Sequence, residues 1–468
     1  MDRTDRAPAW CAGLLVSALL AAYLNGLRGV FQFDDYNVIV FNPVVHSLQA
    51  WWADLGSGIR PLLKLTYAIQ WTIAPDSALS FHVFNIGVHV AAAGLVFLLA
   101  RQLARSHGAA PDGPLPLAAL AAALVFGLHP AHTEAVTYIS GRSSSLMALF
   151  YLAGFLSYVA GTLDGRRWLA VLVAPLCFVL AVATKETAVT FPLALLLWEW
   201  SRPGSLEIGS IVRRQAASWA VLLVVAAILW RHPIYGVRLV PDLTPDALHR
   251  SLLTQVDALT HLVRRLVVVY PLNIDPDLRV VTAWTWAGAL RALFLASLAG
   301  LGVVALRRRP WWGFGILWFF LQLAPTNSLL PRLDLANDRH LYLASAGLCT
   351  ALGVELQRWL GPGAGARRWV RWPLVAWIIA CAALTALRNH DYSSEIRLWE
   401  QTARVSPHKP RVFNNLGFAY GAAGCLEQAE AAYREALRLN PRYELALENL
   451  AALRERSRME TNVRCGEG

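Results

Sequence analysis

Long apolar runs, separated by short polar segments, make up most of the 468-residue chain. Several runs reach the roughly 17–25 residues that a helix needs to cross a bilayer. We therefore predict an all-α, polytopic membrane protein with eleven spans, rather than a large soluble core. The predicted spans are residues 8–28, 81–101, 115–130, 143–162, 168–184, 187–200, 216–231, 284–306, 311–330, 339–357 and 372–388.

One further segment, residues 252–272, is nearly apolar enough to span. It carries four ionisable side chains near its middle, which are Asp257, His261, Arg264 and Arg265. A charge at the bilayer centre is costly, whereas an amphipathic helix at the membrane surface keeps its charges in water. We therefore predict an interfacial or re-entrant helix on the outer face.

The loops between the predicted spans differ in charge. Arginines gather in the loops at 101–105, 164–168, 307–310 and 366–372 and at Arg214. Acids, histidines and prolines gather in the loops at 29–80, 129–142, 185–186, 232–283 and 331–338. The positive-inside rule places the arginine-rich loops in the cytoplasm. The N-terminus is then cytoplasmic and the C-terminus extracytoplasmic.

Composition agrees with a membrane protein. Hydrophobic residues make up 56% of the chain and charged residues only 16%, against about 25% charged in soluble proteins. The net charge of +11 would point to nucleic acid in a soluble protein, but here the arginines lie between apolar runs, so we predict no nucleic-acid partner. The scarcity of lysine and the bias to Arg and Ala favour a bacterial origin, and hence a bacterial cytoplasmic membrane.

The termini and the cysteines add two expectations. The apolar run near the N-terminus is not followed by an evident small-residue cleavage site, so we predict an uncleaved first helix. The six cysteines show no CxxC or metal-ligand spacing. We therefore predict no disulfide framework and no zinc site.

The chain changes character after Arg388. Small, aromatic and proline positions there follow the pattern of a tetratricopeptide repeat, in which small residues let paired helices pack; they are Asn415, Leu416, Gly417, Tyr420, Gly424, Ala429, Tyr433, Ala436 and Pro441. A half-repeat at 399–410 and a helix at 443–456 flank it. Because isolated repeats are marginally stable, we expect the repeat domain, 389–468, to lean on the membrane domain, 1–388.

Two adjacent acids, Asp34 and Asp35, follow the first predicted span. Their neighbours Phe31, Phe33 and Tyr36 are aromatic, which favours a packed cleft over a solvated loop. Two adjacent like charges raise one of the two pKa values, and a carboxylate with a tuned pKa suits a general base. Ordinary loop acids are the alternative.

The next outer loop holds His129, His132 and Glu134 within six residues. The spacing is reminiscent of a metal site. However, Pro130 separates the histidines, and no helical HExxH pattern is present. We therefore expect these side chains to line a polar cleft with the aspartates, and a divalent metal is not favoured.

Basic side chains near the span ends are candidates for binding phosphate. Arg142 begins a predicted span, where its guanidinium can grip a phosphate with two parallel hydrogen bonds; snorkelling to the surface is the alternative. Arg60 lies in an amphipathic stretch and can face phosphate or headgroups. Lys185 and Glu186 share a short hairpin, where they pair or line the cleft.

The last outer loop adds Asp338 and Arg339. All the acid and histidine clusters thus fall on one predicted membrane face, although they are far apart in sequence. Their convergence on a single site accounts for so many ionisable groups beside apolar span ends.

Eight short motifs occur in order along the chain: FDD at 33–35, RPL at 60–62, FHVFNIGVH at 81–89, HPAHTEAV at 129–136, GR at 141–142, KE at 185–186, WFFLQLAPTNSLLP at 318–331 and DRHLYLASAG at 338–347. With the repeat, they resemble the transmembrane and tetratricopeptide-repeat-containing O-mannosyltransferases, which are similar to the dolichyl-phosphate-mannose protein mannosyltransferases of the GT-C fold. The chain departs from them in having only one to two repeats and Ala344 in place of a proline.

The resemblance implies a GT-C fold and transfer of a mannose-like sugar from a polyprenyl-phosphate donor, by inverting displacement and without a resident cofactor. One of Asp34 and Asp35 would be the base, with Asp34 preferred. Arg142, with Arg60 or Arg264, would hold the donor phosphate. The sugar or acceptor cleft would comprise His129, His132, Glu134, Lys185, Glu186, Asp338 and Arg339.

The expected acceptor is a Ser or Thr hydroxyl of an extracytoplasmic protein that the repeat engages. One alternative keeps the fold and glycosylates a lipid or an envelope glycan, but repeat grooves usually hold peptide. The other alternative is a non-catalytic, membrane-anchored scaffold. A scaffold would not need Asp34, Arg142 and the histidine cluster.

Overall fold

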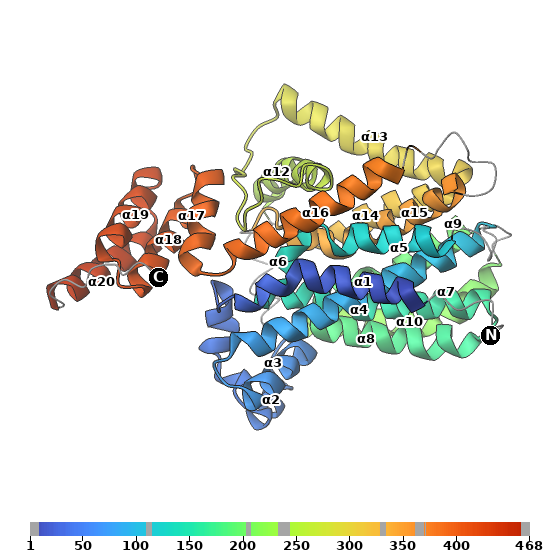
Figure 1. Cartoon of the computed structure of the whole chain (residues 1–468), viewed down its shortest axis with the longest axis horizontal. Helices are drawn as coiled ribbons and strands as arrows, with labels where there is room; N and C mark the ends of the chain where they lie inside the picture. Colours follow the sequence, from blue (N-terminus) through green and yellow to red (C-terminus); the bar gives the residue numbers. More distant parts are fainter. Residues whose placement is uncertain are drawn as a thin grey trace.

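The computed structural model describes residues 9–108, 115–202, 207–232, 244–327, 334–360, 369 and 371–459. Every regular element within these ranges is helical. Figure 1 shows a bundle of long helices from which a smaller group, the repeat helices, projects at one end. These features confirm the predicted all-α class.

The helices of the bundle come from most of the chain. They are α1 (Ala9–Tyr23), α4 (Ala78–Ser106), α5 (Leu115–Gly127), α7 (Arg142–Leu163), α8 (Ala174–Thr184), α9 (Phe191–Ser201), α10 (Ile208–Arg231), α13 (Trp286–Arg308), α14 (Pro310–Leu323), α15 (Leu341–Leu360) and α16 (Arg371–Asp391). Shorter or peripheral helices are α2 (Leu48–Asp54), α3 (Pro61–Ile73), α6 (Thr133–Val136) and α12 (Pro245–Arg265).

Six helical segments are long and apolar enough to cross a membrane: Ala9–Arg28, Ala78–Ser106, Ile139–Leu163, Ile208–Arg231, Trp286–Arg308 and Arg371–Asp391. The pair Leu115–Gly127 and Pro130–Val136, bent by 53°, would be a seventh. Other predicted spans fall on shorter helices such as α9, whose 11 residues rise only about 16 Å. The predicted count of eleven spans is therefore not confirmed.

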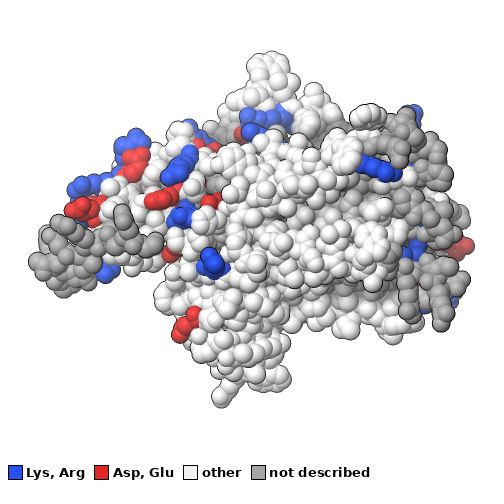
Figure 2. All heavy atoms as spheres, viewed as in Figure 1, with Lys and Arg blue, Asp and Glu red and all other residues white. Residues whose placement is uncertain are grey.

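Charged side chains avoid the middle of the bundle. In Figure 2 they lie mainly over the repeat helices and near the opposite end of the molecule, with a broad uncharged belt between. Such a belt suits contact with lipid, where an unpaired charge is costly. It supports a multi-pass membrane protein, while the direction of insertion stays a prediction.

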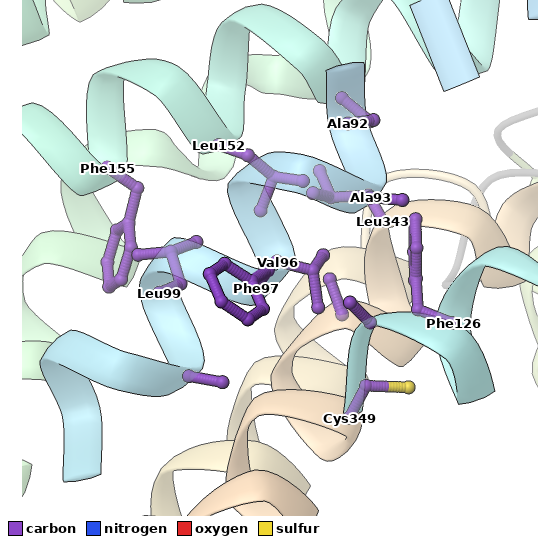
Figure 3. Packing of buried hydrophobic residues seen from close by; sticks show 14 of the residues in the cluster. Ala92, Ala93, Val96, Phe97, Leu99, Phe126, Leu152, Phe155, Leu343 and Cys349 are labelled. Carbon is purple, nitrogen blue, oxygen red and sulfur yellow. The ribbon is translucent and has the colours of Figure 1, made fainter. Parts of the chain in front are cut away.

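The core of the bundle packs α4 against α5, α7 and α15. Figure 3 shows side chains of α4, among them Leu99 beside Phe155 of α7, packed together with Leu343 and Cys349 of α15. Small residues let these helices approach closely, as is common between helices in membranes. This tightly packed core fixes the helix ends from which the site is built.

The helix α12 fits part of the predicted surface segment. It buries an apolar face that includes Leu253, Ala258 and Leu262, and it ends at Arg265, so the segment does not continue as one long apolar span. It also is not among the segments apolar enough to cross a membrane. Its place at the outer membrane surface stays a prediction. Parts of the neighbouring loops, 233–243 and 328–333, lie outside the described residues.

The C-terminal helices pair as a repeat should. They are α17 (Glu395–Val405), α18 (Pro410–Ala422), α19 (Leu426–Leu439) and α20 (Glu444–Met459). The turn between α18 and α19 places Gly424 at φ +79°, a left-handed conformation that favours glycine. Gly417 lies so close to the Tyr433 ring that a Cβ there would meet it at 2.7 Å. The repeat prediction is confirmed.

Two further expectations concern this segment. The helix α16 ends at Asp391 and α17 begins at Glu395, close to the predicted division at residue 388, which itself stays a prediction. Cys425 is disulfide-bonded, which the prediction of no disulfide framework did not anticipate. Cys11, Cys177, Cys349 and Cys381 are free thiols.

Candidate active site

The two adjacent aspartates have different surroundings. The Asp35 side chain is 1% exposed. Its carboxylate accepts hydrogen bonds from the backbone N–H of Gln32 at 3.0 Å and of Ser140 at 2.8 Å, and also from the Ser140 hydroxyl. Asp35 thus ties the loop after the first helix to the start of α7, which is a structural role.

Asp34 is half-buried and faces charged groups instead. Its backbone N–H donates to the Tyr138 hydroxyl at 3.1 Å. Burial raises the pKa of Asp34 above its usual value, and the nearby Arg339 guanidinium opposes that rise. Burial also raises the pKa of Asp35, to about 7, against the hydrogen bonds from Ser140 and Gln32. Asp34 is therefore the better placed of the two for proton transfer.

Arg339 connects Asp34 to the neighbouring acids. Its guanidinium lies 6.0 Å from the centre of the Tyr138 ring. Its nearest oxygens on Glu134 and Asp334 lie 3.6 and 3.7 Å away, outside hydrogen-bonding distance, although its backbone N–H donates to Glu134 at 3.2 Å. In the better amide orientation, Asn337 also accepts a hydrogen bond from it at 2.8 Å. The two loose carboxylate contacts leave the guanidinium able to take an anionic ligand.

A small polar cavity lies beside Arg339. Its lining comes from α7, α14 and the loops before α9 and α15, and comprises Ser144, Met147, Lys185, Thr187, Gln322, Thr326, Arg339, His340 and Leu343. The Lys185 ammonium donates to the Ser144 hydroxyl at 2.8 Å. A lysine, an arginine and several hydroxyl and amide groups suit an anionic, hydrogen-bonding ligand such as a phosphate.

A second, smaller and apolar cavity lies further along the same helices. Its lining is Leu99, Leu103, Leu152, Phe155, Val159, Trp198, Phe314, Trp318, Ala346, Gly347 and Thr350. On α14, Trp318 of this cavity is one helical turn from Gln322 of the polar cavity, and on α15 Gly347 is one turn from Leu343. The apolar and polar cavities therefore follow one another along α14 and α15.

Arg142 does not lie where a phosphate would reach it. Its side chain is fully buried, and neutral acceptors take its N–H groups: Asn85 at 2.5 Å, Gln70 at 2.5 Å and the Phe81 carbonyl at 3.1 Å. It also lies over the rings of Tyr67 and two phenylalanines. The prediction that Arg142 binds the donor phosphate is therefore corrected: here the guanidinium links α7 to α3 and α4.

The two histidines of the predicted cleft are also internal. His129 contacts the Leu266 carbonyl at 3.3 Å through Nε2 and accepts from a backbone N–H through Nδ1. His132 bonds the Phe126 carbonyl at 2.8 Å and the Ser345 hydroxyl at 3.0 Å. Both rings use both nitrogens within the fold, so the expectation that they line the cleft is corrected.

Glu134 belongs to the site because the backbone brings it there. A Cβ added at Gly141 would lie 1.9 Å from the Glu134 carbonyl oxygen, so the two loop segments approach as closely as only glycine permits. The close approach of the two loop segments places the Glu134 carboxylate 3.6 Å from the Arg339 guanidinium. One of its carboxylate oxygens, Oε1, is buried without a hydrogen bond.

Of four other predicted residues, three form contacts with an oppositely charged side chain and one is exposed at the surface. Arg60 grips Glu186 with two hydrogen bonds of 2.9 and 2.6 Å; although burial alone would raise it, this pairing brings the pKa of Glu186 down to about 2. Asp338 is buried, 3.8 Å from Arg265. Arg264 is exposed on α12. The cavity therefore unites Lys185 and Arg339 but not Arg60, Arg264, Glu186 or Asp338.

Several residues at the site were not predicted. Tyr138 and Gln322 carry no recognisable motif by themselves. Arg411 and Glu395 lie in the repeat segment, where the repeat pattern assigns them no chemistry, yet both reach the loops around Asp34. Within the described ranges, no three His, Cys, Asp or Glu side chains cluster as a metal site requires. That no metal takes part stays a prediction.

Comparison with known proteins shows what the chain is similar to. The tetratricopeptide repeat model matches residues 410–443. A protein O-mannosyl-transferase of Caenorhabditis elegans is 25% identical over 457 residues, which cover 92% of this chain and 63% of that protein. The protein O-mannosyl-transferase TMTC3 of Mus musculus is 24% identical over 92% of this chain and 51% of its own length. Tmtc1 of Drosophila melanogaster is 34% identical over 40% of this chain and 22% of its length.

The chain thus spans less than two thirds of these relatives. The likeness nevertheless runs through both the membrane helices and the repeat, and it agrees with the order of the eight motifs. The chain is therefore similar, over most of its length, to proteins named protein O-mannosyl-transferases, and it carries a tetratricopeptide repeat.

Proposed function

We propose that this chain is an integral-membrane protein O-mannosyl-transferase that uses a polyprenyl-phosphate-linked mannose as its donor. The observation that carries the proposal is the placement of a half-buried carboxyl, Asp34, beside Arg339, which in turn lines a cationic cavity with Lys185. A transferase of this kind needs a base for the acceptor and cations for the leaving phosphate, and the two lie side by side here. The printed names of the relatives support the same activity.

The reaction can be written for these residues. Asp34 takes the proton from a Ser or Thr hydroxyl, and the oxygen attacks the anomeric carbon as its bond to the phosphate oxygen breaks. The electron pair of that bond leaves with the polyprenyl phosphate, whose new negative charge Arg339 and Lys185 stabilise. Attack from the face opposite the phosphate inverts the anomeric carbon.

The proposed setting is the outer face of a bacterial cytoplasmic membrane, with the repeat extracytoplasmic. The arginine-rich loops support this orientation through the positive-inside rule. A polyprenyl-phosphate donor also requires the cavity to open toward the membrane. The acceptor is then a secreted or membrane protein.

The experiment that tests the proposal offers the purified chain, in lipid nanodiscs, a synthetic polyprenyl-phosphate mannose and three acceptors. These are a Ser/Thr-rich peptide, the same peptide with every Ser and Thr replaced by Ala, and a glycolipid extract. We expect one hexose on the first peptide and none on the second. Mannose transferred only to lipid would support the glycolipid alternative, and no transfer to any acceptor would support a scaffold.

A further inference from the structure

The repeat segment is joined to the loop that carries Asp34. The Gln32 side-chain amide donates to the Tyr392 carbonyl at 2.5 Å, and the backbone N–H of Phe33 donates to the Glu395 carboxylate at 3.1 Å. The Phe33 ring packs edge-on against Trp399 of α17, with centroids 5.2 Å apart. In Figure 1, α17 follows directly from the end of α16 at the same end of the bundle as the loop. The repeat therefore does not hang from a free linker.

The Phe33 backbone needs this support. Its φ of +51° is left-handed, which is uncommon for any residue but glycine and a genuine outlier for a bulky one. Such a conformation persists only when its surroundings fix it. The N–H of Asp34 is held by Tyr138 and the Asp35 carboxylate by Ser140, both from the membrane domain. The Phe33 N–H is held from the repeat segment, through Glu395.

A second link reaches Arg339 from the other side. Arg411, at the start of α18, donates to Asp334 at 2.7 Å and to Asp275 at 2.8 Å. The other Asp334 oxygen lies 3.7 Å from Arg339. Lys409 also pairs with Asp275. Arg411 thus fixes the Asp334 carboxylate, which, like that of Glu134, lies close to the Arg339 guanidinium.

We propose that Glu395 and Arg411 are positioning residues of the transfer site, so that the repeat segment completes the active site in addition to meeting the acceptor. Glu395 holds the Phe33–Asp34 peptide in the conformation that aims the base. Arg411 holds Asp334 and, through it, Arg339. The kinetic part of this inference rests on the proposed function, whereas its structural part does not.

Two substitutions at Glu395 separate geometry from charge. Glu395→Gln removes the charge but keeps an oxygen that can accept the Phe33 N–H at the same reach. Glu395→Asp keeps the charge but withdraws the carboxylate by one methylene, beyond a 3.1 Å contact. A positioning role predicts a nearly normal Gln variant and a defective Asp variant. A role in local electrostatics predicts the reverse.

The matched control is Glu400→Ala on the same helix. The Glu400 carboxylate accepts the Tyr420 hydroxyl at 2.6 Å within the repeat, so its loss perturbs the repeat without touching the loop of Asp34. For Arg411→Gln the control is Lys409→Gln, which loosens the same docking contact at Asp275. Both controls should leave kcat within about twofold of wild type.

The experiment measures transfer and backbone protection on the full chain in nanodiscs. Displacing a reacting group by about 1 Å can cost roughly 10²-fold in rate, so we expect Glu395→Asp to lower kcat by roughly 10–10²-fold with the KM for peptide changed less than threefold. Hydrogen–deuterium exchange of residues 30–36 should rise in Glu395→Asp and stay at the wild-type level in Glu395→Gln and Glu400→Ala. Arg411→Gln should lower kcat by roughly tenfold, and by much less when Asp334→Asn is already present.

Each outcome decides between the two claims. Unchanged exchange of residues 30–36 in Glu395→Asp would overturn the positioning role, whatever the activity. If the wild type transfers no sugar while Glu395→Asp still raises the exchange of residues 30–36, the structural link is retained and the proposed function is rejected. Equal kcat losses in Glu395→Asp and Glu400→Ala would reduce the effect to repeat stability and overturn the inference.

Discussion

Buried glutamates with opposite surroundings lie near the two ends of α15. Near its C-terminal end, Glu355 accepts hydrogen bonds from Arg309 at 2.8 and 3.0 Å and from the indoles of Trp311 and Trp312 at 3.0 and 3.1 Å. Before its N-terminal end, Arg339 stands 3.6 Å from Glu134, one of whose oxygens has no hydrogen bond.

The contrast separates structure from function. A buried polar group without a partner lowers stability by about 1–3 kcal/mol, so a cluster that serves only the fold is expected to satisfy its members, as at Glu355. The cluster at Arg339 leaves an acid oxygen unsatisfied and borders a cavity. Loose contacts of this kind are expected where a ligand completes the set of partners.

The largest expected effect comes from replacing Arg339 by glutamine, with the same replacement at Arg309 as the comparison. Arg339→Gln should lower kcat/KM for transfer by roughly 10²–10³-fold, the usual loss when one donor to a developing negative charge is removed. Arg309→Gln should change kcat/KM less than threefold and lower only the thermal midpoint. Steady-state assays with the lipid donor check both, and similar losses in the two variants would erase the distinction between the two ends.

The pH dependence of stability should also distinguish Asp35 from Glu355. The pKa of Asp35 is raised by burial to about 7, from about 3.9 in an unfolded chain. Between these pH values the folded state holds the proton on Asp35 more tightly than the unfolded chain does. The contribution of Asp35 to the free energy of unfolding therefore falls as pH rises from about 4 to 7, by at most roughly 4 kcal/mol.

Thermal midpoints measured across that pH range test this sign. We expect the wild type to lose stability from pH 4 to 7 and Asp35→Asn to lose distinctly less, because its amide does not ionise. Glu355→Gln, the control, should not reduce the loss of stability from pH 4 to 7. A wild-type midpoint that rises steadily over this range, with no difference in Asp35→Asn, would refute the assigned burial of Asp35.

The smallest effect on activity is expected at Arg142. Arg142→Lys leaves the Asn85 and Gln70 oxygens short of a donor, which should lower stability by about 1–3 kcal/mol. Donor KM should change less than threefold, because the side chain is enclosed by α3, α4 and α7. A large rise in donor KM with an unchanged thermal midpoint would restore Arg142 as a phosphate ligand.

Pattern and periodicity were enough for the helices and the repeat, because both depend on neighbours a few residues apart. The packing of Gly417 against Tyr433 and the turn at Gly424 follow directly from the repeat pattern. Span number did not follow as readily. Helices such as α9 are interrupted by short turns and prolines, and apolar composition alone does not tell one long span from two shorter helices.

The site was only partly predictable, for a physical reason. An arginine at a span start either reaches outward to headgroups or turns inward, and for Arg142 the choice depends on Asn85 and Gln70, far away in sequence. The same holds for Glu395, whose partner Phe33 is separated from it by 362 residues. The aspartate pair and Arg339 were found because charge beside apolar span ends is a local signal.

The central claim is that Asp34 is the base and Asp35 its structural support. The most direct measurement is single-turnover transfer by Asp34→Asn and Asp35→Asn, with lipid-donor binding measured on the same preparations. We predict that Asp34→Asn binds the donor like wild type and transfers mannose roughly 10²–10⁴-fold more slowly, the usual contribution of a general base. Asp35→Asn should lose stability more than transfer rate. Full transfer by Asp34→Asn, or its abolition only in Asp35→Asn, would contradict the account.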